Sequence, residues 1–332
     1  GISVYEEGRV RPEWAGDSEM TFARVYAAGN LPKLVDFNAA FTRPDLVAAA
    51  YFQASLVVGL LVERHGEAVL RTLMSAYAAG ASTEEALRKA TGAGLSDLQS
   101  AFDAMVRERY GDAARALETP KNVEIPRSAP AAALVEIADR HANSFPVQMA
   151  AGRAMAAAGS HAEAIAAFER AARLVPFARG DDSPRAHLAR LALAGGDTAR
   201  AASELEALVR HDHANVDAAR QLASLAEKAG NEPLRLLAYE RIVEVDPFDA
   251  AAHAALGRIA MGRRDAALAV REFQAALAAG PVDRVAAHCD LAEAYLLGGR
   301  SADARREAVA ALEIAPTFER AQELLLKTTE GK

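Results

Sequence analysis

The sequence predicts an all-α protein in which a helical N-terminal domain is followed by a solenoid of stacked helix pairs. Two observations lead to this prediction. Apolar residues make up 51% of the 332 residues and aromatic residues only 6%, a composition that favours closely packed helices over strands. The second observation is a repeat of about 34 residues that begins near Phe145 and continues almost to the end of the chain.

Charge, cysteine content and hydropathy exclude several classes of partner and site. The formal net charge of -7 and the pI near 5.7 provide no general attraction for nucleic acid or anionic lipid. Cys289 is the only cysteine, which excludes an intrachain disulfide and a cysteine-based zinc site. The longest apolar run, 46–62, contains Gln53 and is shorter than the roughly 20 residues that cross a bilayer. We therefore expect no nucleic-acid partner, no membrane span and a buried helix over this run.

The N-terminal domain is expected to contain four long helical segments after a first stretch broken by proline and glycine. Their predicted spans are 46–64, 67–79, 83–90 and 95–110. Asp45 stands where the first of them begins, and Ser82 or Thr83 can cap the third. Ser96 with Gln99 resembles a capping box for the fourth.

The domain organisation follows from a break in helical periodicity at 119–128. This segment contains Pro120 and Pro126 and is predicted to be a linker. Residues 1–118 then form the helical N-terminal domain, and residues 129–328 form the repeat array. We expect 131–141 to be a half-repeat or N-terminal cap and 318–327 to be the C-terminal capping helix.

The array contains about five units in one frame. The units begin near Phe145, Asp182, Val216, Ala250 and Val285, so successive starts are 37, 34, 34 and 35 residues apart. Small residues recur where two helices would approach, a glycine stands between the helices, and a proline ends most units. An ordinary alanine-rich bundle would also show helical periodicity, but it gives no reason for one frame to recur.

This pattern resembles the tetratricopeptide-repeat family, whose members stack helix pairs into a right-handed superhelix. The resemblance implies a groove lined by the first helix of each pair, with a protein or peptide partner held in it. The ninth position of that helix is occupied by Arg153, Arg190 and Arg258, and the third unit carries Arg220 one turn earlier. By the family geometry, these arginines form a ladder that grips acidic side chains or a free C-terminal carboxylate of the partner.

The alternative is that these arginines are solvated surface charges paired with Glu227 or Glu293. Helix surfaces need charged residues in any case, so exposure alone does not distinguish the two interpretations. Cys289 also falls at a groove-lining position of its helix, where we expect a small buried side chain.

A second resemblance concerns the first residues of the chain. Gly1 to Glu7 are similar to the segment after the third zinc ligand in gluzincin (peptidase MA-like) metallopeptidases, including bacterial ones, in which a glycine directly follows the ligand glutamate. The stretch that begins at Tyr51 is similar to the tyrosine-bearing helix of that superfamily, although Ala54 replaces the family glycine. This resemblance implies that Tyr51 stabilises the oxyanion of a tetrahedral intermediate.

Zinc hydrolysis needs three protein ligands and a general base, and no His-Glu-x-x-His is present in this chain. We expect the chain as given to hold no metal or cofactor and not to be an enzyme, whereas a longer parent could bind zinc. His211-Asp212-His213 has metal-like spacing but no third ligand nearby. The first function left open is an interaction scaffold. The second is the C-terminal part of a zinc metallopeptidase whose repeats recruit substrate or partner, and the export of such bacterial proteins favours an extracytoplasmic or periplasmic site.

Overall fold

The computed structural model describes residues 1–11, 14, 16–121, 123, 125 and 129–329, and these residues form only helices and their connections. The predicted all-α class is therefore confirmed. The chain divides into two compact units, Gly1–Asp212 and His213–Lys332. The predicted linker 119–128 falls partly outside the described residues, Pro126 included, and the domain boundary placed there stays a prediction.

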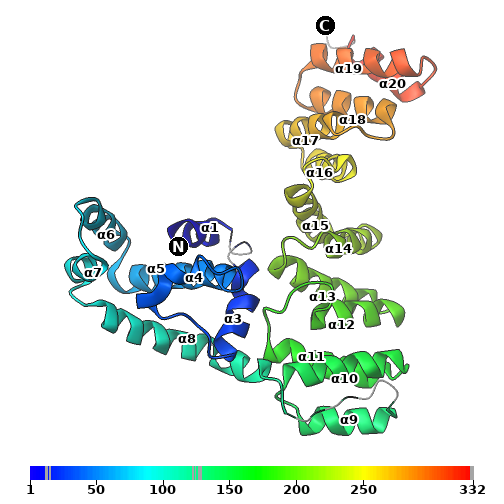
Figure 1. Cartoon of the computed structure of the whole chain (residues 1–332). Coiled ribbons are helices and arrows are strands. Elements are labelled where there is room, and N and C mark those ends of the chain that lie inside the picture. The colour runs from blue at the N-terminus through cyan, green and yellow to red at the C-terminus, as the bar shows by residue number, and fades with distance from the viewer. Residues whose placement is uncertain (12–13, 15, 122, 124, 126–128, 330–332) are drawn as a thin grey trace. The chain divides into compact units, whose positions relative to one another are not determined.

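The first unit contains the N-terminal helices and the first two repeats (Figure 1). Its N-terminal helices are α1 (Ile2–Val10), α3 (Glu19–Ala27), α4 (Phe37–Ala40), α5 (Val47–His65), α6 (Ala68–Ala78), α7 (Thr83–Thr91) and α8 (Leu95–Leu117). They are followed by α9 (Ala131–Arg140) and by the pairs α10 (Phe145–Ala157) with α11 (His161–Leu174) and α12 (Pro184–Ala194) with α13 (Thr198–His211). The four helices predicted before residue 118 all form, and α8 continues past the predicted end at residue 110.

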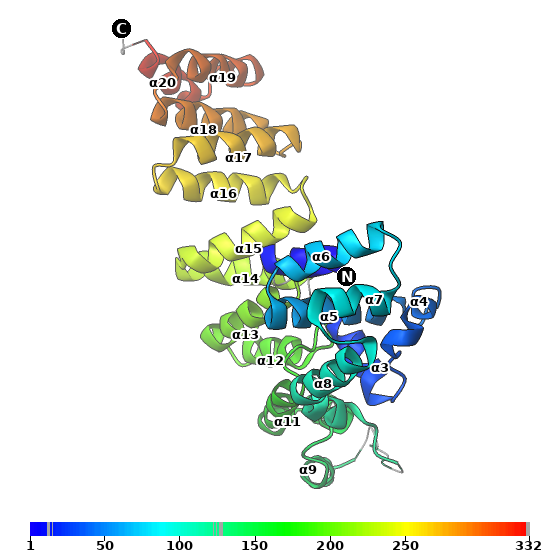
Figure 2. The same cartoon turned by 90° about the vertical axis from the view of Figure 1, so that its left-hand side faces the viewer.

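An aromatic cluster joins the N-terminal helices to the first repeat. The fully buried ring of Phe22 on α3 lies 5.2 Å from the ring of Tyr110 on α8 and 5.3 Å from that of Phe52 on α5. Tyr110 also meets Phe177, in the turn after α11, at 6.0 Å. Helix α8 contacts α10 and α11 as well, and Figure 2 shows α8 beside α11. The N-terminal helices therefore pack on the first repeat, and Leu117 and Phe177 contact the hydrophobic clusters of both.

Helix α5 is the one described helix that is long and apolar enough to cross a membrane, with a mean hydropathy of 1.3 over an 18-residue window. It contacts α1, α3 and α6. Gln53 on this helix is fully buried, and its Nε2 donates to the carbonyl of Pro32 at 2.8 Å. These contacts are typical of a helix in the core of a folded domain.

Two of the capping predictions concern α5 and α7. Ser82 caps α7 in a complete capping box with Glu85, as expected. Asp45 does not cap α5, because the helix begins after Leu46. Asp45 instead forms an ion pair with Arg43 at 2.6 Å.

The predicted capping box of Ser96 and Gln99 is wrong. Helix α8 begins after Gly94, which lies two residues before Ser96, and the Gly94 N–H donates to Asp97 at 2.9 Å. Gln99 instead accepts a hydrogen bond from the backbone N–H of Leu34 at 2.7 Å. It thereby ties α8 to the chain before α4.

The second unit contains the last three repeats and the terminal helix. Its pairs are α14 (Val216–Ala229) with α15 (Glu232–Val245), α16 (Ala250–Gly262) with α17 (Ala266–Ala278) and α18 (Arg284–Leu297) with α19 (Ser301–Ile314), and α20 (Glu319–Lys327) follows them. Asn215, Asp249 and Asp283 cap α14, α16 and α18, each by accepting a backbone N–H at 2.9 Å. These first helices begin at or within one residue of the predicted unit starts Val216, Ala250 and Val285.

The two helices of a pair touch where the sequence has its smallest residue. A Cβ added to Gly257 on α16 would lie 2.5 Å from the ring of Phe273 on α17, which is 3% exposed. In the first repeat, a Cβ added to Gly152 would lie 2.8 Å from the buried ring of Phe168. In both repeats, only glycine lets the ring rest against the backbone of the facing helix.

The turn inside each pair needs a residue in the left-handed region. Gly159, Gly196, Gly230 and Gly299 fill this position in four repeats, with φ between 63° and 80°. In the fourth repeat it is held by Arg264, with φ of 59°. The left-handed conformation costs a residue with a Cβ about 1–2 kcal/mol. The turn geometry is thus kept even where glycine is missing.

We expect Gly257→Ala to lower the free energy of unfolding of the protein by about 1–3 kcal/mol, because the new methyl group collides with Phe273. Gly262→Ala on the same helix is the matched control, since nothing lies within 4 Å of its added Cβ. The control should leave stability unchanged or raise it by up to about 1 kcal/mol. Urea unfolding followed by circular dichroism measures both, and equal effects would contradict the packing described.

Candidate functional site

The four arginines predicted to form a ladder lie exposed on the first helices of their repeats. Arg153 on α10 and Arg190 on α12 belong to the first unit, and Arg220 on α14 and Arg258 on α16 belong to the second. The side chains of Arg153, Arg220 and Arg258 are 44%, 50% and 64% exposed. Each unit thus presents two of these cations to solvent, and a single ladder over both stays a prediction.

Three of these arginines meet an aspartate of the following repeat. Arg153 Nη1 lies 2.9 Å from Asp182 Oδ2. Arg220 Nη2 lies 3.1 Å from Asp249 Oδ2. The Nε of Arg258 is 3.9 Å from Asp290. Because both partners of the first pair are exposed, the contact between Arg153 and Asp182 contributes little to stability.

The alternative interpretation named Glu227 and Glu293 as partners of these arginines, but both glutamates pair elsewhere. Glu227 accepts bonds from Arg235 and Tyr239, and Glu293 pairs with Arg320 at 2.9 Å. The aspartate partners were missed by the sequence analysis. The sequence does carry a signal for these partners, which is a constant spacing. Asp182 follows Arg153 by 29 residues, and Asp249 follows Arg220 by 29 residues.

In the first unit the arginines belong to a network centred on His187 of α12. Its Nε2 lies 2.7 Å from Asp182 and its Nδ1 lies 3.1 Å from Arg190 Nη2, while its ring stacks on Phe168 with centroids 4.4 Å apart. Burial lowers the pKa of His187, and the bond to Asp182 opposes this shift only in part. For Asp182, burial favours the neutral form, but the bond from His187 and the charge of Arg153 outweigh it and hold its pKa below the usual range.

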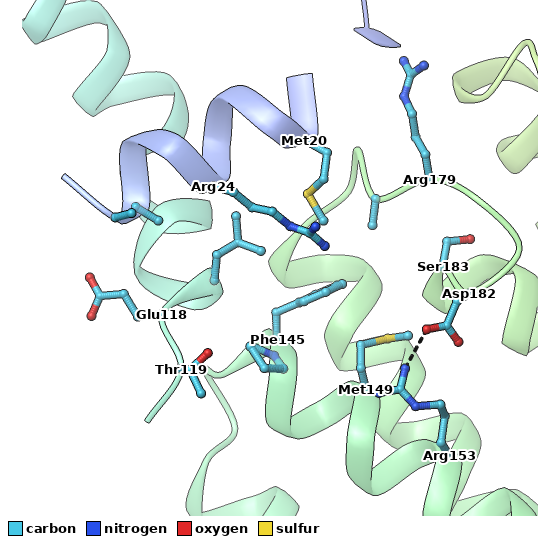
Figure 3. Close-up of a pocket in the computed structure, with 15 residues that line it drawn as sticks. Met20, Arg24, Glu118, Thr119, Phe145, Met149, Arg153, Arg179, Asp182 and Ser183 are labelled. Atoms are coloured by element: carbon cyan, nitrogen blue, oxygen red, sulfur yellow. Dashed lines mark hydrogen bonds and ion pairs between the residues drawn. The ribbon is translucent and has the colours of Figure 1, made fainter. Parts of the chain in front are cut away.

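A cavity of about 790 Å³ opens beside Arg153 within the first unit (Figure 3). Its lining comes from α3, the end of α8, α10 and the turn before α12. Phe145 and Met149 form an apolar wall and are only 9% and 4% exposed. Arg24 and Asp182 bring charged groups to the same cavity. The arrangement can hold an apolar group and an anion side by side.

Tyr51, the residue with a role implied by the peptidase resemblance, lies on α5 and is 49% exposed. Its ring packs edge-on against Phe41, with centroids 5.0 Å apart. Gly1 lies against the same helix one turn later, because an added Cβ would be 3.0 Å from the carbonyl oxygen of Ala54. The start of α1 therefore packs close to Tyr51 along α5, and the catalytic role of Tyr51 stays a prediction.

Within the described part of the chain, no three His, Cys, Asp or Glu side chains gather as a metal ion would require. Asp212, from the His-Asp-His run, accepts a hydrogen bond from the Gly180 N–H at 2.9 Å and so holds the long turn before α12. Cys289 is fully buried on α18, as expected, and burial raises the pKa of its thiol.

No family model and no curated protein matches the chain. Several solved structures are similar to it. YrrB, a tetratricopeptide-repeat protein with an unusual peptide-binding site, is 17% identical over 58% of this chain and 98% of its own, with a TM-score of 0.40. Within each unit the array is an α-solenoid of stacked helix pairs, the fold class that the repeat pattern predicts. The repeat domain of P58(IPK) is 15% identical over 98% of this chain and 91% of its own, with a TM-score of 0.30.

A tetratricopeptide-repeat protein of Thermus thermophilus is also similar. It is 23% identical over 56% of this chain and 99% of its own, with a TM-score of 0.30. These likenesses concern the fold alone.

We expect the stability of the protein to fall as the pH drops below about 6.5, the usual value for histidine, because the folded state holds the pKa of His187 below that value. A depressed histidine pKa means that the unfolded chain binds the proton more readily than the folded protein. The stability that depends on neutral His187 is therefore fully present above the unfolded pKa and is lost as the pH falls below it. The charged groups that face His187 are Asp182, Arg190 and Arg153.

Urea midpoints at pH 7.5 and pH 5.5 test this expectation. His187→Gln keeps a hydrogen-bonding side chain without titrating, so its midpoint should fall less than that of the unchanged protein over the same interval. Identical falls in both proteins would assign the pH dependence to other groups.

Proposed function

We propose that the repeat array is a protein–protein interaction scaffold that holds an acidic peptide along the first helices of its repeats. The observation that carries the proposal is the exposure of Arg153, Arg190, Arg220 and Arg258 on those helices. A guanidinium group binds a carboxylate through two parallel hydrogen bonds, which gives a peptide both affinity and orientation.

The aspartate that now meets Arg153 does not block this function. Asp182 is 72% exposed, and a surface ion pair contributes only about 0–1 kcal/mol. A carboxylate of the partner can therefore replace Asp182 on Arg153 at little cost. The net charge of -7 also discourages an acidic peptide from binding elsewhere on the chain. Binding would be confined to surfaces where arginines gather.

Reversal of Arg153, Arg190 and Arg258 to Glu in one variant should weaken acidic-peptide binding by at least about 100-fold, since each lost charge pair costs on the order of 1–3 kcal/mol. The measurement is fluorescence anisotropy with labelled peptides selected from a library rich in Asp and Glu. The matched control reverses Arg173, Arg210 and Arg306, which are exposed on the second helices α11, α13 and α19.

The control changes the net charge by the same amount and draws on the same two units. If both variants lose binding equally, the effect is general electrostatics and the site is not on the first helices. If neither variant loses binding, the proposed role of the arginines is wrong.

We propose a second candidate for a longer parent of this chain, a zinc metallopeptidase whose repeats recruit substrate or partner. The observation that favours it is the packing of Gly1 against Ala54, one turn along α5 from the exposed Tyr51. A ligand glutamate directly before Gly1 would then stand close to the helix that carries the tyrosine. Zinc would act there as a Lewis acid and activate water.

The test of this candidate is the coding sequence upstream of Gly1 together with zinc analysis of the natural product. We expect a His-Glu-x-x-His followed by a glutamate directly before Gly1, and stoichiometric zinc. In such a parent, Tyr51→Phe should lower kcat by about 100- to 1,000-fold while zinc stays bound. An upstream sequence without these ligands would leave the scaffold as the one function proposed.

A further inference from the structure

The cavity beside Arg153 is built jointly by the N-terminal helices and the repeats. Helix α3 contributes Met20 and Arg24, the end of α8 contributes Leu117, and the first repeat contributes Phe145 and Met149. All of these residues belong to the first unit. The close-up shows Met20 and Arg24 on one side of the cavity and the α10 residues on the other (Figure 3). The repeats alone would supply only part of this site.

The walls of the cavity suit a bulky apolar side chain. Phe145 and Met149, both on α10, are buried in the core of the first repeat, while Met20 and Leu117 are partly buried and pack on the same core. Methionine side chains are unbranched and polarisable, so they adapt to groups of different shape. A cavity of about 790 Å³ has room for such a side chain and for the backbone that carries it.

Three arginines line this cavity, Arg24, Arg153 and Arg179, and their guanidinium groups have different contacts within the protein. Arg153 pairs with Asp182. The guanidinium of Arg179 packs against Gly16 and leaves no room for a Cβ there. For the exposed Arg24, no ion pair or hydrogen bond of the guanidinium is found within the described part of the chain. Arg24 can therefore bind an anion without giving up an existing contact.

We propose that this composite pocket binds a segment of the partner peptide in which a bulky apolar residue stands next to an acidic one. The apolar side chain lies against Phe145 and Met149, and the neighbouring carboxylate bonds to Arg24. The inference rests on the peptide-binding function proposed above. It adds that the N-terminal helices are part of the site and select this residue pair.

The experiment uses the full chain and labelled peptides with acetylated and amidated ends. Three peptides share one glutamate-containing background and carry Leu-Glu, Leu-Gln or Ala-Glu at the centre. We expect Leu-Glu to bind at least about tenfold more tightly than either of the others, a difference of about 1.4 kcal/mol. Arg24→Gln should remove the preference for Leu-Glu over Leu-Gln and keep the preference for leucine over alanine.

The matched control is Arg71→Gln, which neutralises another exposed arginine of the N-terminal helices, on α6. It should keep both preferences. Because Arg24 and Arg71 are exposed, neither change should impair folding, which circular dichroism checks. Loss of the Leu-Glu preference in both variants would overturn the assignment to Arg24.

Other outcomes separate this inference from the function on which it rests. If Arg24→Gln keeps the Leu-Glu preference while reversal of the three repeat arginines abolishes binding, the composite pocket is wrong and the scaffold function stands. If no acidic peptide binds at all, both are wrong. If the same peptides bind only when they are made with a free C-terminal carboxylate, the assignment to an acidic side chain is overturned.

Discussion

The ring of Phe273 can rest against the backbone of α16 because Gly257 has no Cβ, and this contact sets how closely α16 and α17 approach each other. Gly152 and Phe168 form the same contact in the first unit. A single pair held in this way still leaves one apolar flank uncovered, so the next pair must pack on it. Each first helix packs on the second helix of its own pair and on the neighbouring pair. The positions that neither contact covers are exposed to solvent. The arginines occupy such positions, and their placement is therefore a consequence of the packing.

In the first unit, the same contact reaches the surface through a short chain of neighbours. Phe168 stacks on His187, His187 bonds to Asp182, and Asp182 pairs with Arg153. The first and last of these contacts join the first repeat to the second. The bond between His187 and Asp182 lies within the second repeat and holds both residues in place. A carboxylate that replaced Asp182 on Arg153 would leave Asp182 to His187 alone. If Arg153 binds a peptide as proposed, that binding and the packing between the first two repeats would be linked through one imidazole ring.

Local signals in the sequence were sufficient for the helices and the repeat frame, because capping and periodicity act over a few residues. Ser82 caps α7 as its spacing with Glu85 predicts. Both failures arose because the expected capping residue has another partner. Asp45 pairs with the nearby Arg43, and Gln99 accepts a hydrogen bond from the distant Leu34. Arg24 could not be found at all, since its place at the cavity depends on how α3 packs against α5 and α8. Such a contact between distant segments leaves no periodic trace in one sequence.

The N-terminal helices matter to the proposed site whatever their ancestry. Tyr110 packs against Phe177 of the repeat array, and α3 contacts both α5 and α8 while it carries Arg24 to the cavity. Tyr51 lies on α5, the helix against which α3 packs. If a longer parent is a peptidase, its catalytic helix and the peptide pocket would share one core, so a substrate could be bound and cleaved on the same unit. If it is not, the same packing still gives the scaffold a pocket that the repeats could not form alone.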